Sequence, residues 1–176
     1  MLWLLPLLFT LATDPAPRAA SPSPREDATR LLADPDRRVR SSEPKLVNLI
    51  DEGVRRSHTF ARLIQMVHES DVIVYVEGGR ELPGLVDGGL LLLPRPVGTR
   101  YLRILVRQDL HRDEVIALIA HELRHAIEVG EATDVRTREA FVNLYQKIGF
   151  SAPGSHRFDT QAAQDAGRTV RRELGG

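Results

Sequence analysis

The sequence predicts an α+β domain in which a small, mainly antiparallel, three-stranded sheet packs against one buried helix and several further helices. Three observations predict this fold: a β-branched and aromatic run at 71–79, a hairpin pattern at 89–107, and helical periodicity on both sides of them. The chain of 176 residues suits one domain with a hydrophobic core and is short for two. We expect this single domain to span residues 43–174.

Two segments without the periodicity of a packed element precede the domain. The first, MLWLLPLLFTLA, is an apolar run of signal-peptide length, shorter than the ~20 residues that cross a bilayer. It predicts an exported protein, periplasmic or secreted, with a signal peptide over residues 1–20 and no membrane span. The next residues are rich in Pro, Ala and Ser, so a linker is predicted over residues 21–42.

Two amphipathic helices are predicted before the sheet. The first covers residues 43–54. The second begins after Ser57 or Thr59 as N-cap, and its apolar residues fall at i, i+3, i+4 and i+7, namely Phe60, Leu63, Ile64 and Val67.

The strands are predicted from runs that are too short for helices. DVIVYVEGG at 71–79 is β-branched and aromatic, and Gly78 and Gly79 end it. GLLLLP at 89–94 and RYLRILVR at 100–107 flank a turn-forming segment, which predicts a hairpin. Polar residues alternate in the second of these runs, so one of its faces is expected to contact solvent.

Three helices are predicted after the hairpin. Residues 109–113 supply capping candidates for a helix that runs to about Val129, where Gly130 can end it. Apolar residues surround this helix on nearly every side, so most of it should be buried. Further helices are predicted over residues 137–149 and 159–174.

Composition excludes several classes of function. The 24 Lys and Arg residues balance 24 Asp and Glu residues, so no net field attracts nucleic acid or an anionic membrane. A local cluster of arginines at Arg37, Arg38 and Arg40 is interpreted as a solvated helix face. The chain has no cysteine, so disulfides and thiolate chemistry are excluded and any metal must be held by nitrogen and oxygen.

The buried helix carries ionisable groups in the pattern His121, Glu122 and His125. Histidines at i and i+4 lie about 6 Å apart along a helix and about 40° apart around it, so both imidazoles can reach one ion. The glutamate between them is offset around the helix and can reach a water on that ion, which is the task of a general base. Unpaired charge would be costly in such apolar surroundings.

With this motif on a helix that follows a small sheet, residues 57–174 resemble a minimal zincin metallopeptidase of the gluzincin type. The resemblance implies that His121 and His125 bind Zn²⁺, that Glu122 polarises the attacking water, and that a strand near the helix binds an extended peptide. It implies a hydrolase, a peptidase acting on a peptide or protein substrate. The segments HELRHAIEV and FDTQAAQDAGRTVRREL are also similar to small exported bacterial proteins.

Four carboxylates are candidates for a third ligand. Asp159 is favoured, because it lies on a separate element after a comfortable reversal of the chain, although an Asp in this position is also a good N-cap. Glu139 and Glu131 are alternatives. Glu128 faces the same side of the helix as the histidines but lies too far along it to reach the ion well, so a hydrogen bond to a ligating histidine suits it better.

The sequence also allows two other interpretations of the motif. In one, the chain is a non-catalytic exported binding module whose metal or charged pair is a structural pin. In the other, the charges solvate one helix face and the histidines pack against the sheet. Tyr145 and His156 are available as donors to a reacting carbonyl, but a core position for Tyr145 and a loop position for His156 are favoured.

Overall fold

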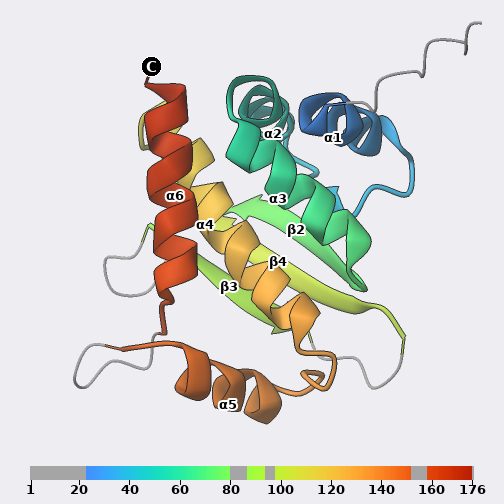
Figure 1. Cartoon of the computed structure of the whole chain (residues 1–176), viewed down its shortest axis with the longest axis vertical. Coiled ribbons are helices and arrows are strands. Elements are labelled where there is room, and N and C mark those ends of the chain that lie inside the picture. The colour runs from blue at the N-terminus through green and yellow to red at the C-terminus, as the bar shows by residue number, and fades with distance from the viewer. Residues whose placement is uncertain (1–22, 80–86, 94–97, 152–157, 176) are drawn as a thin grey trace, which may run out of the picture.

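The computed structural model describes residues 23–79, 87–93, 98–151 and 158–175, and it confirms the α+β class (Figure 1). The predicted signal peptide lies outside these residues. None of the described helices is long and apolar enough to cross a membrane. The elements in chain order are α1 (Pro24–Ala33), β1 (Val39–Arg40), α2 (Pro44–Arg56), α3 (His58–Glu69), β2 (Val72–Gly78), β3 (Gly88–Leu93), β4 (Arg100–Val106), α4 (Arg112–Glu131), α5 (Arg138–Ile148) and α6 (Gln161–Leu174).

The sheet has four strands in the order β1-β2-β4-β3, where the sequence predicted three. It is mixed rather than mainly antiparallel, because β1 pairs with β2 and β2 pairs with β4 in parallel, and only β3 and β4 are antiparallel. The predicted hairpin of β3 and β4 is present. The added strand has two residues, too few to produce a recognisable pattern, and the direction of pairing between β2 and the hairpin leaves no local signal in the sequence.

The range 21–42, predicted as a linker, contains α1 and β1. Ser23 caps α1 in a reciprocal capping box with Glu26, and the buried Ala28 packs the helix against the core. The apolar face of α1 is narrow and its mean hydropathy is low, which is why its composition resembled that of a linker.

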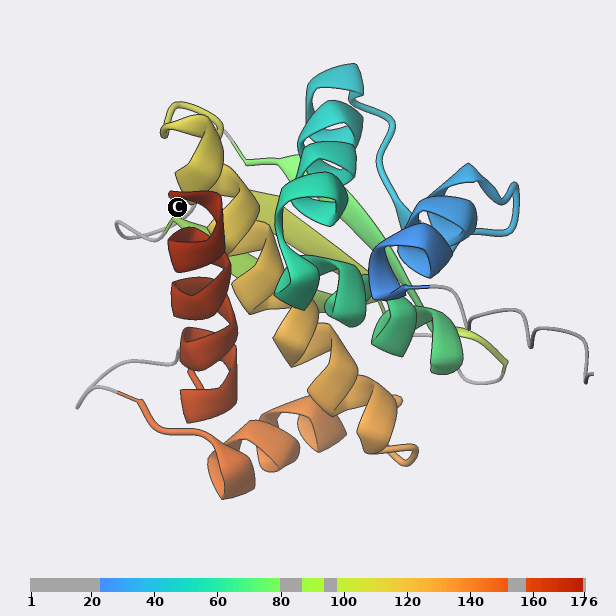
Figure 2. The ribbon, with the colours of Figure 1, turned by 45° about the horizontal axis from the view of Figure 1, so that its top comes forward.

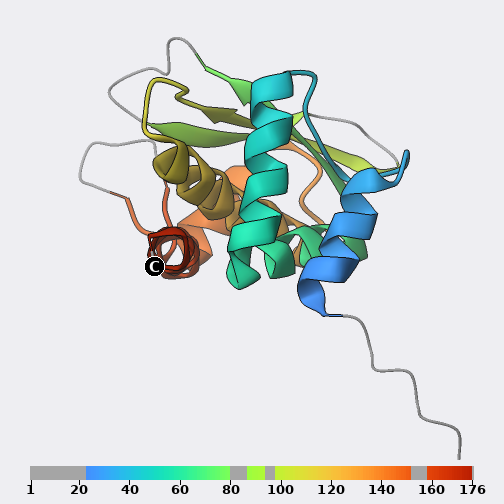
Figure 3. The same ribbon diagram turned by 90° about the horizontal axis from the view of Figure 1, so that it is seen from above.

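One face of the sheet is covered by helices. Val72, Val74 and Val76 of β2 point into the core, and the residues between them lie on the opposite face. Seen from above, the helices lie below the sheet (Figure 3). A second view shows α6 running beside α4, with α5 across the end of both (Figure 2).

The central helix α4 is buried on nearly every side, as predicted. Its buried residues include Ile116, Leu123 and Val129, and also the ionisable Glu122, His125 and Glu128. Its first turn carries Asp113 and Glu114, which interact favourably with the positive end of the helix dipole.

Arg100 satisfies the other end of this helix. Its side chain on β4 is 2% exposed and donates hydrogen bonds to the carbonyl oxygens of Val129 (2.6 Å), Gly130 (3.0 Å) and Ala132 (2.6 Å). Asp71 pairs with the same guanidinium. Gly130 was predicted to end α4, but the helix continues to Glu131, because a buried arginine caps the last carbonyls and no glycine is needed.

We predict that Arg100→Met lowers the free energy of unfolding by about 3 kcal/mol, because several buried carbonyls lose their donor at once. Arg103→Met is the matched control on the same strand, since this side chain is 40% exposed and faces away from the helices. It should cost less than about 1 kcal/mol. Urea unfolding of both variants measures the difference, and equal losses would contradict the capping role of Arg100.

Candidate metal centre

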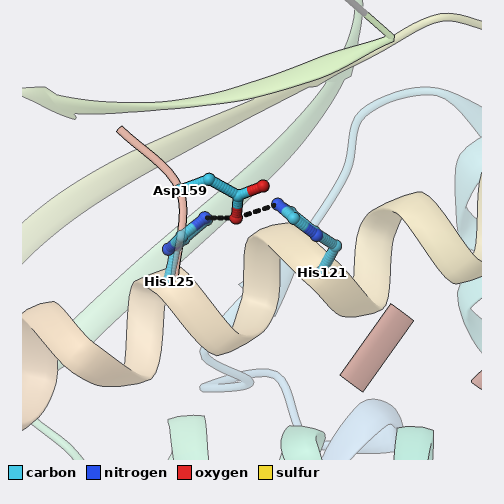
Figure 4. Close-up of side chains that lie close together, drawn as sticks. All are labelled: His121, His125 and Asp159. Atoms are coloured by element: carbon cyan, nitrogen blue, oxygen red, sulfur yellow. Dashed lines mark ion pairs between the residues drawn. The ribbon is translucent and has the colours of Figure 1, made fainter. Parts of the chain in front are cut away.

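His121 and His125 lie on the same side of α4, one turn apart. Their ring centroids are 4.9 Å apart and the ring planes meet at 78°. Figure 4 shows the Nε2 side of both rings turned toward one carboxylate. The convergence that the i, i+4 spacing predicts is therefore present.

That carboxylate belongs to Asp159, the residue favoured from the sequence. Its Oδ1 atom lies 3.4 Å from Nε2 of His121 and 3.6 Å from Nε2 of His125 (Figure 4). One nitrogen from each ring and one carboxylate oxygen all lie within 4.8 Å of one another. The three side chains thus come together from two elements that are far apart in the sequence.

Local backbone structure explains how Asp159 reaches the histidines. A two-residue bridge pairs its backbone with that of Phe150, with N–O distances of 2.9 Å in both directions. The N-cap of α6 is Thr160, whose side chain accepts from the amide of Ala163 at 3.1 Å. Because Thr160 performs the capping that Asp159 was also suited to, the Asp159 carboxylate can turn toward the rings.

The donor set fits a zinc-type ion. Two imidazole nitrogens and one carboxylate oxygen from separate elements, with no sulfur, form a ligand set that zinc accepts. Within the part of the chain that the structure describes, this is the only group of three such side chains close enough to share an ion. Three protein ligands leave one position of a tetrahedral ion for water or substrate.

Glu128 and Thr160 hold the ring of His125 in place. Oε2 of Glu128 lies 2.9 Å from Nδ1 of His125, and its Oε1 accepts a hydrogen bond from the Thr160 hydroxyl at 2.7 Å. The predicted hydrogen bond between Glu128 and a candidate ligand is therefore present. With Nδ1 bonded to Glu128, the Nε2 atom faces Asp159, the arrangement that orients ligating histidines in metal sites.

Glu122 lies beside the cluster and is 5% exposed. No described side chain or backbone group makes a hydrogen bond with its carboxylate. Its Oε1 atom would lie only 3.0 Å from a Cβ at Gly88, the first residue of β3, so the backbone of this strand passes close above it. Burial raises the pKa of Glu122 to about 7. The charge of His125 opposes this rise, and the charge of Asp159 adds to it.

The two histidines differ in their protonation. Burial lowers the pKa of His121, and the neighbouring His125 lowers it further. Burial also opposes protonation of His125, but its hydrogen bond with Glu128 and the nearby carboxylates outweigh it, so the pKa of His125 is raised. The neutral form of His121 that prevails at neutral pH is the form that ligates metals.

Of the other candidate residues, Glu131 and Glu139 lie away from the cluster, whereas the ring of Tyr145 packs edge-on against that of His125, with ring centroids 5.3 Å apart. Glu131 is exposed and pairs with Arg124 at 3.2 Å, and Glu139 lies at the exposed start of α5. Tyr145 is buried as expected, and its hydroxyl donates to the backbone oxygen of His125 at 3.0 Å. His156 lies outside the described residues.

Two residues of this site were not predicted from the sequence. Thr160 was overlooked because Asp159 was the more obvious cap, although a threonine three residues before Ala163 is itself a capping signal. Gly88 had no signal beyond its place in a pair of glycines, since its contact with Glu122 depends on how β3 crosses α4.

A cavity of about 310 Å³ adjoins the cluster and extends between α4 and α6. His121 lines it together with apolar or small residues and with charged side chains, the latter being Asp87, Glu114, Arg168 and Arg171. Helix α6 lies close to α4 here, because a Cβ at Gly167 would be 3.2 Å from the carbonyl oxygen of Ala117 and 3.3 Å from Cβ of His121. The cluster is thus reached by a space of the size that holds small ligands or side chains.

Searches of protein-family models, of curated proteins and of solved structures give no significant match to this chain.

We predict that Glu122→Gln stabilises the metal-free protein at pH 8 by as much as about 3 kcal/mol. The folded-state pKa of about 7 lies above the ordinary value of 4.5, so the folded protein holds this proton more tightly than the unfolded chain does. That stabilisation is complete below pH 4.5 and is lost as the pH rises through 7. Glutamine does not ionise, so the variant does not lose this stability as the pH rises. Urea unfolding at pH 4.5 and pH 8 measures it, and a difference between the two proteins that does not grow with pH would contradict the raised pKa.

Proposed function

We propose that this protein is a zinc-dependent hydrolase, a peptidase in which activated water attacks a peptide or amide carbonyl. The observation that carries the proposal is the position of Glu122, a buried carboxylate without a hydrogen bond in the described structure, next to two histidines and an aspartate that converge. A carboxylate this deeply buried, to which no described group donates, is unfavourable when charged, and carboxylates with such raised pKa values gather at functional sites.

Each residue of the site has a role in this proposal. His121 and His125 would hold the ion through Nε2, and Asp159 through Oδ1. The chemistry that zinc supplies in such a site is the acidification of water and the polarisation of a carbonyl group. Glu122 accepts a proton at a carboxylate oxygen and returns it to the leaving amine. A pKa near 7 suits both halves of that transfer.

The position of β3 supports a peptide as the substrate. This strand pairs only with β4 among the described strands, so its outer backbone edge has no strand partner there. An extended peptide can add to such an edge through main-chain hydrogen bonds. Gly88 brings this edge next to Glu122, and the cavity beside His121 can accept a side chain of the bound peptide.

The alternative, a binding module with a structural ion, predicts a different ligand set. Structural zinc sites are closed by four protein ligands. Among the described residues only three side chains converge, and His121 lines a cavity. Both features favour a catalytic arrangement.

We further propose that the protein acts after export, in the periplasm or outside the cell. The apolar segment at residues 1–12 supports this location. Peptide in an extended conformation is the partner that the site favours.

Zinc content and hydrolysis test the proposed function together. We expect the purified protein and Glu122→Gln to bind one zinc ion per chain, and His121→Ala and Asp159→Ala to lose it. Only the unchanged protein should cleave a library of fluorogenic peptides, since Glu122→Gln keeps the ligands and loses the base. This substitution typically lowers kcat by about 10²-fold or more. Zinc binding without hydrolysis in the unchanged protein would favour the structural ion, and no zinc in any of these proteins would refute the metal centre.

The hydrogen bonds of Glu128 with His125 and Thr160 lead to a prediction for two further variants. Glu128→Gln and Thr160→Val should each weaken zinc binding by about 10- to 100-fold, because the ring of His125 loses the group that orients it. Glu131→Gln, a substitution at a 58% exposed side chain of the same helix, is the control and should leave the affinity unchanged. Competition with a zinc-binding dye measures all three. Equal affinities would show that Glu128 does not support the ligand.

A further inference from the structure

Three partly buried arginines near β1 have no carboxylate partner among the described residues. Among the described arginines that are partly or fully buried, every other one lies within 4.0 Å of a carboxylate, namely Arg100, Arg103, Arg107, Arg124 and Arg136. Arg37, Arg38 and Arg40 are also partly buried, and no carboxylate of the described residues pairs with them. From the sequence they were expected to form a solvated helix face. That interpretation is wrong, because they lie in β1 and the segment before it, after α1 has ended.

Backbone contacts hold the guanidinium groups of Arg37 and Arg40 in place, while Arg38 bonds to the carbonyl oxygen of Val72 at 3.5 Å. Arg37 donates to the carbonyl oxygen of Leu32 at 3.1 Å, and Nε of Arg40 donates to the carbonyl oxygen of Arg37 at 2.5 Å. Each group uses one donor in this way. Its remaining N–H groups have no acceptor among the described residues.

A cavity of about 490 Å³ lies at this point of the fold. Its polar lining consists of Arg37, Arg40, Ser41, Ser42, Tyr75 and Glu77. Glu77 is 3.4 Å from Arg103, so its charge is already shared with a different guanidinium. The volume is within the range of small-molecule sites.

The chemistry of this lining selects for an oxyanion. Fixed guanidinium groups form paired, charge-assisted hydrogen bonds with the oxygens of phosphate, and serine hydroxyls add neutral donors. A partly buried positive charge without a counter-charge is unfavourable, and a bound anion removes that cost. The cavity is larger than one phosphate group, which leaves room for the rest of a ligand beside Tyr75.

We propose that this cavity binds a small molecule that carries a phosphate group. The site is separate from the candidate metal centre. It lies at the β1 edge of the sheet, whereas Glu122 lies under β3 at the opposite edge. The two sites can therefore be tested independently, and the failure of one leaves the other intact.

Calorimetric titration with inorganic phosphate and pyrophosphate tests the proposal on the full chain, freed of metal by chelation and then dialysed to remove the chelator. Both anions should bind. Arg37→Gln with Arg40→Gln should weaken binding at least about 10-fold. Arg55→Gln with Arg138→Gln is the matched control, because both arginines are exposed and the net charge changes equally. It should change the affinity less than about 2-fold.

Amide chemical shifts of the unchanged protein provide a second measurement that needs no variant to fold. Pyrophosphate should shift the amide signals of Ser41 and Ser42 and leave those of His121 and His125 unmoved. Absence of binding to both anions would overturn the proposal. So would an equal loss of affinity in the two double variants, or shifts that avoid Ser41 and Ser42.

Discussion

The burial of α4 is the constraint on which the rest of this structure depends. The helix crosses the domain with apolar neighbours on nearly every side, yet it carries Glu122, His125 and Glu128 at positions that are each 5% exposed. Polar groups in such a place are tolerated only when they are bonded or have a task. Glu128 and His125 are bonded to each other, and Glu128 also to Thr160. Glu122 is the member that no described group satisfies.

The same constraint explains the elements around α4. Arg100 crosses from β4 to bond the last carbonyls of the helix, which could not remain buried without donors. Helix α6 lies so close to α4 that a Cβ at Gly167 would crowd the carbonyl oxygen of Ala117 and Cβ of His121. Its cap, Thr160, is also the donor to Glu128, so the start of α6 and the orientation of His125 depend on one residue.

The sequence predicted what is local and periodic. It placed α2, α3 and the hairpin of β3 and β4 because their apolar residues repeat at helical or strand spacing over several turns or pairs. It also placed His121, Glu122 and His125 together, because their spacing on one helix fixes their geometry. The sequence did not predict features that depend on contacts between distant segments. The parallel pairing of β2 with β4, the two-residue strand β1, and the partial burial of Arg37 and Arg40 all depend on tertiary contacts.

Asp159 was favoured as the third member of the site from the length of the chain between it and His125, not from a motif. Its carboxylate does not cap α6, because Thr160 does. It accepts instead from the backbone N–H of Thr160 at 2.7 Å and from the side chain of Gln164 at 2.9 Å, and its Oδ1 atom still faces both rings. Glu128 was placed correctly by helix geometry, since its distance along α4 separates it from His121 but leaves His125 within reach.

The missing side chain at Gly88 limits how this site can be changed. Above Glu122 the surface consists of main-chain atoms of β3, because a Cβ there would also come within 2.8 Å of Cδ1 of Leu118. The peptide group has the same chemistry whatever the residue, so a substitution at Gly88 cannot change this surface without displacing the Glu122 carboxylate beneath it. A change in ligand preference therefore has to come from the helical side of the cavity, where Leu118 and the residues of α6 can vary.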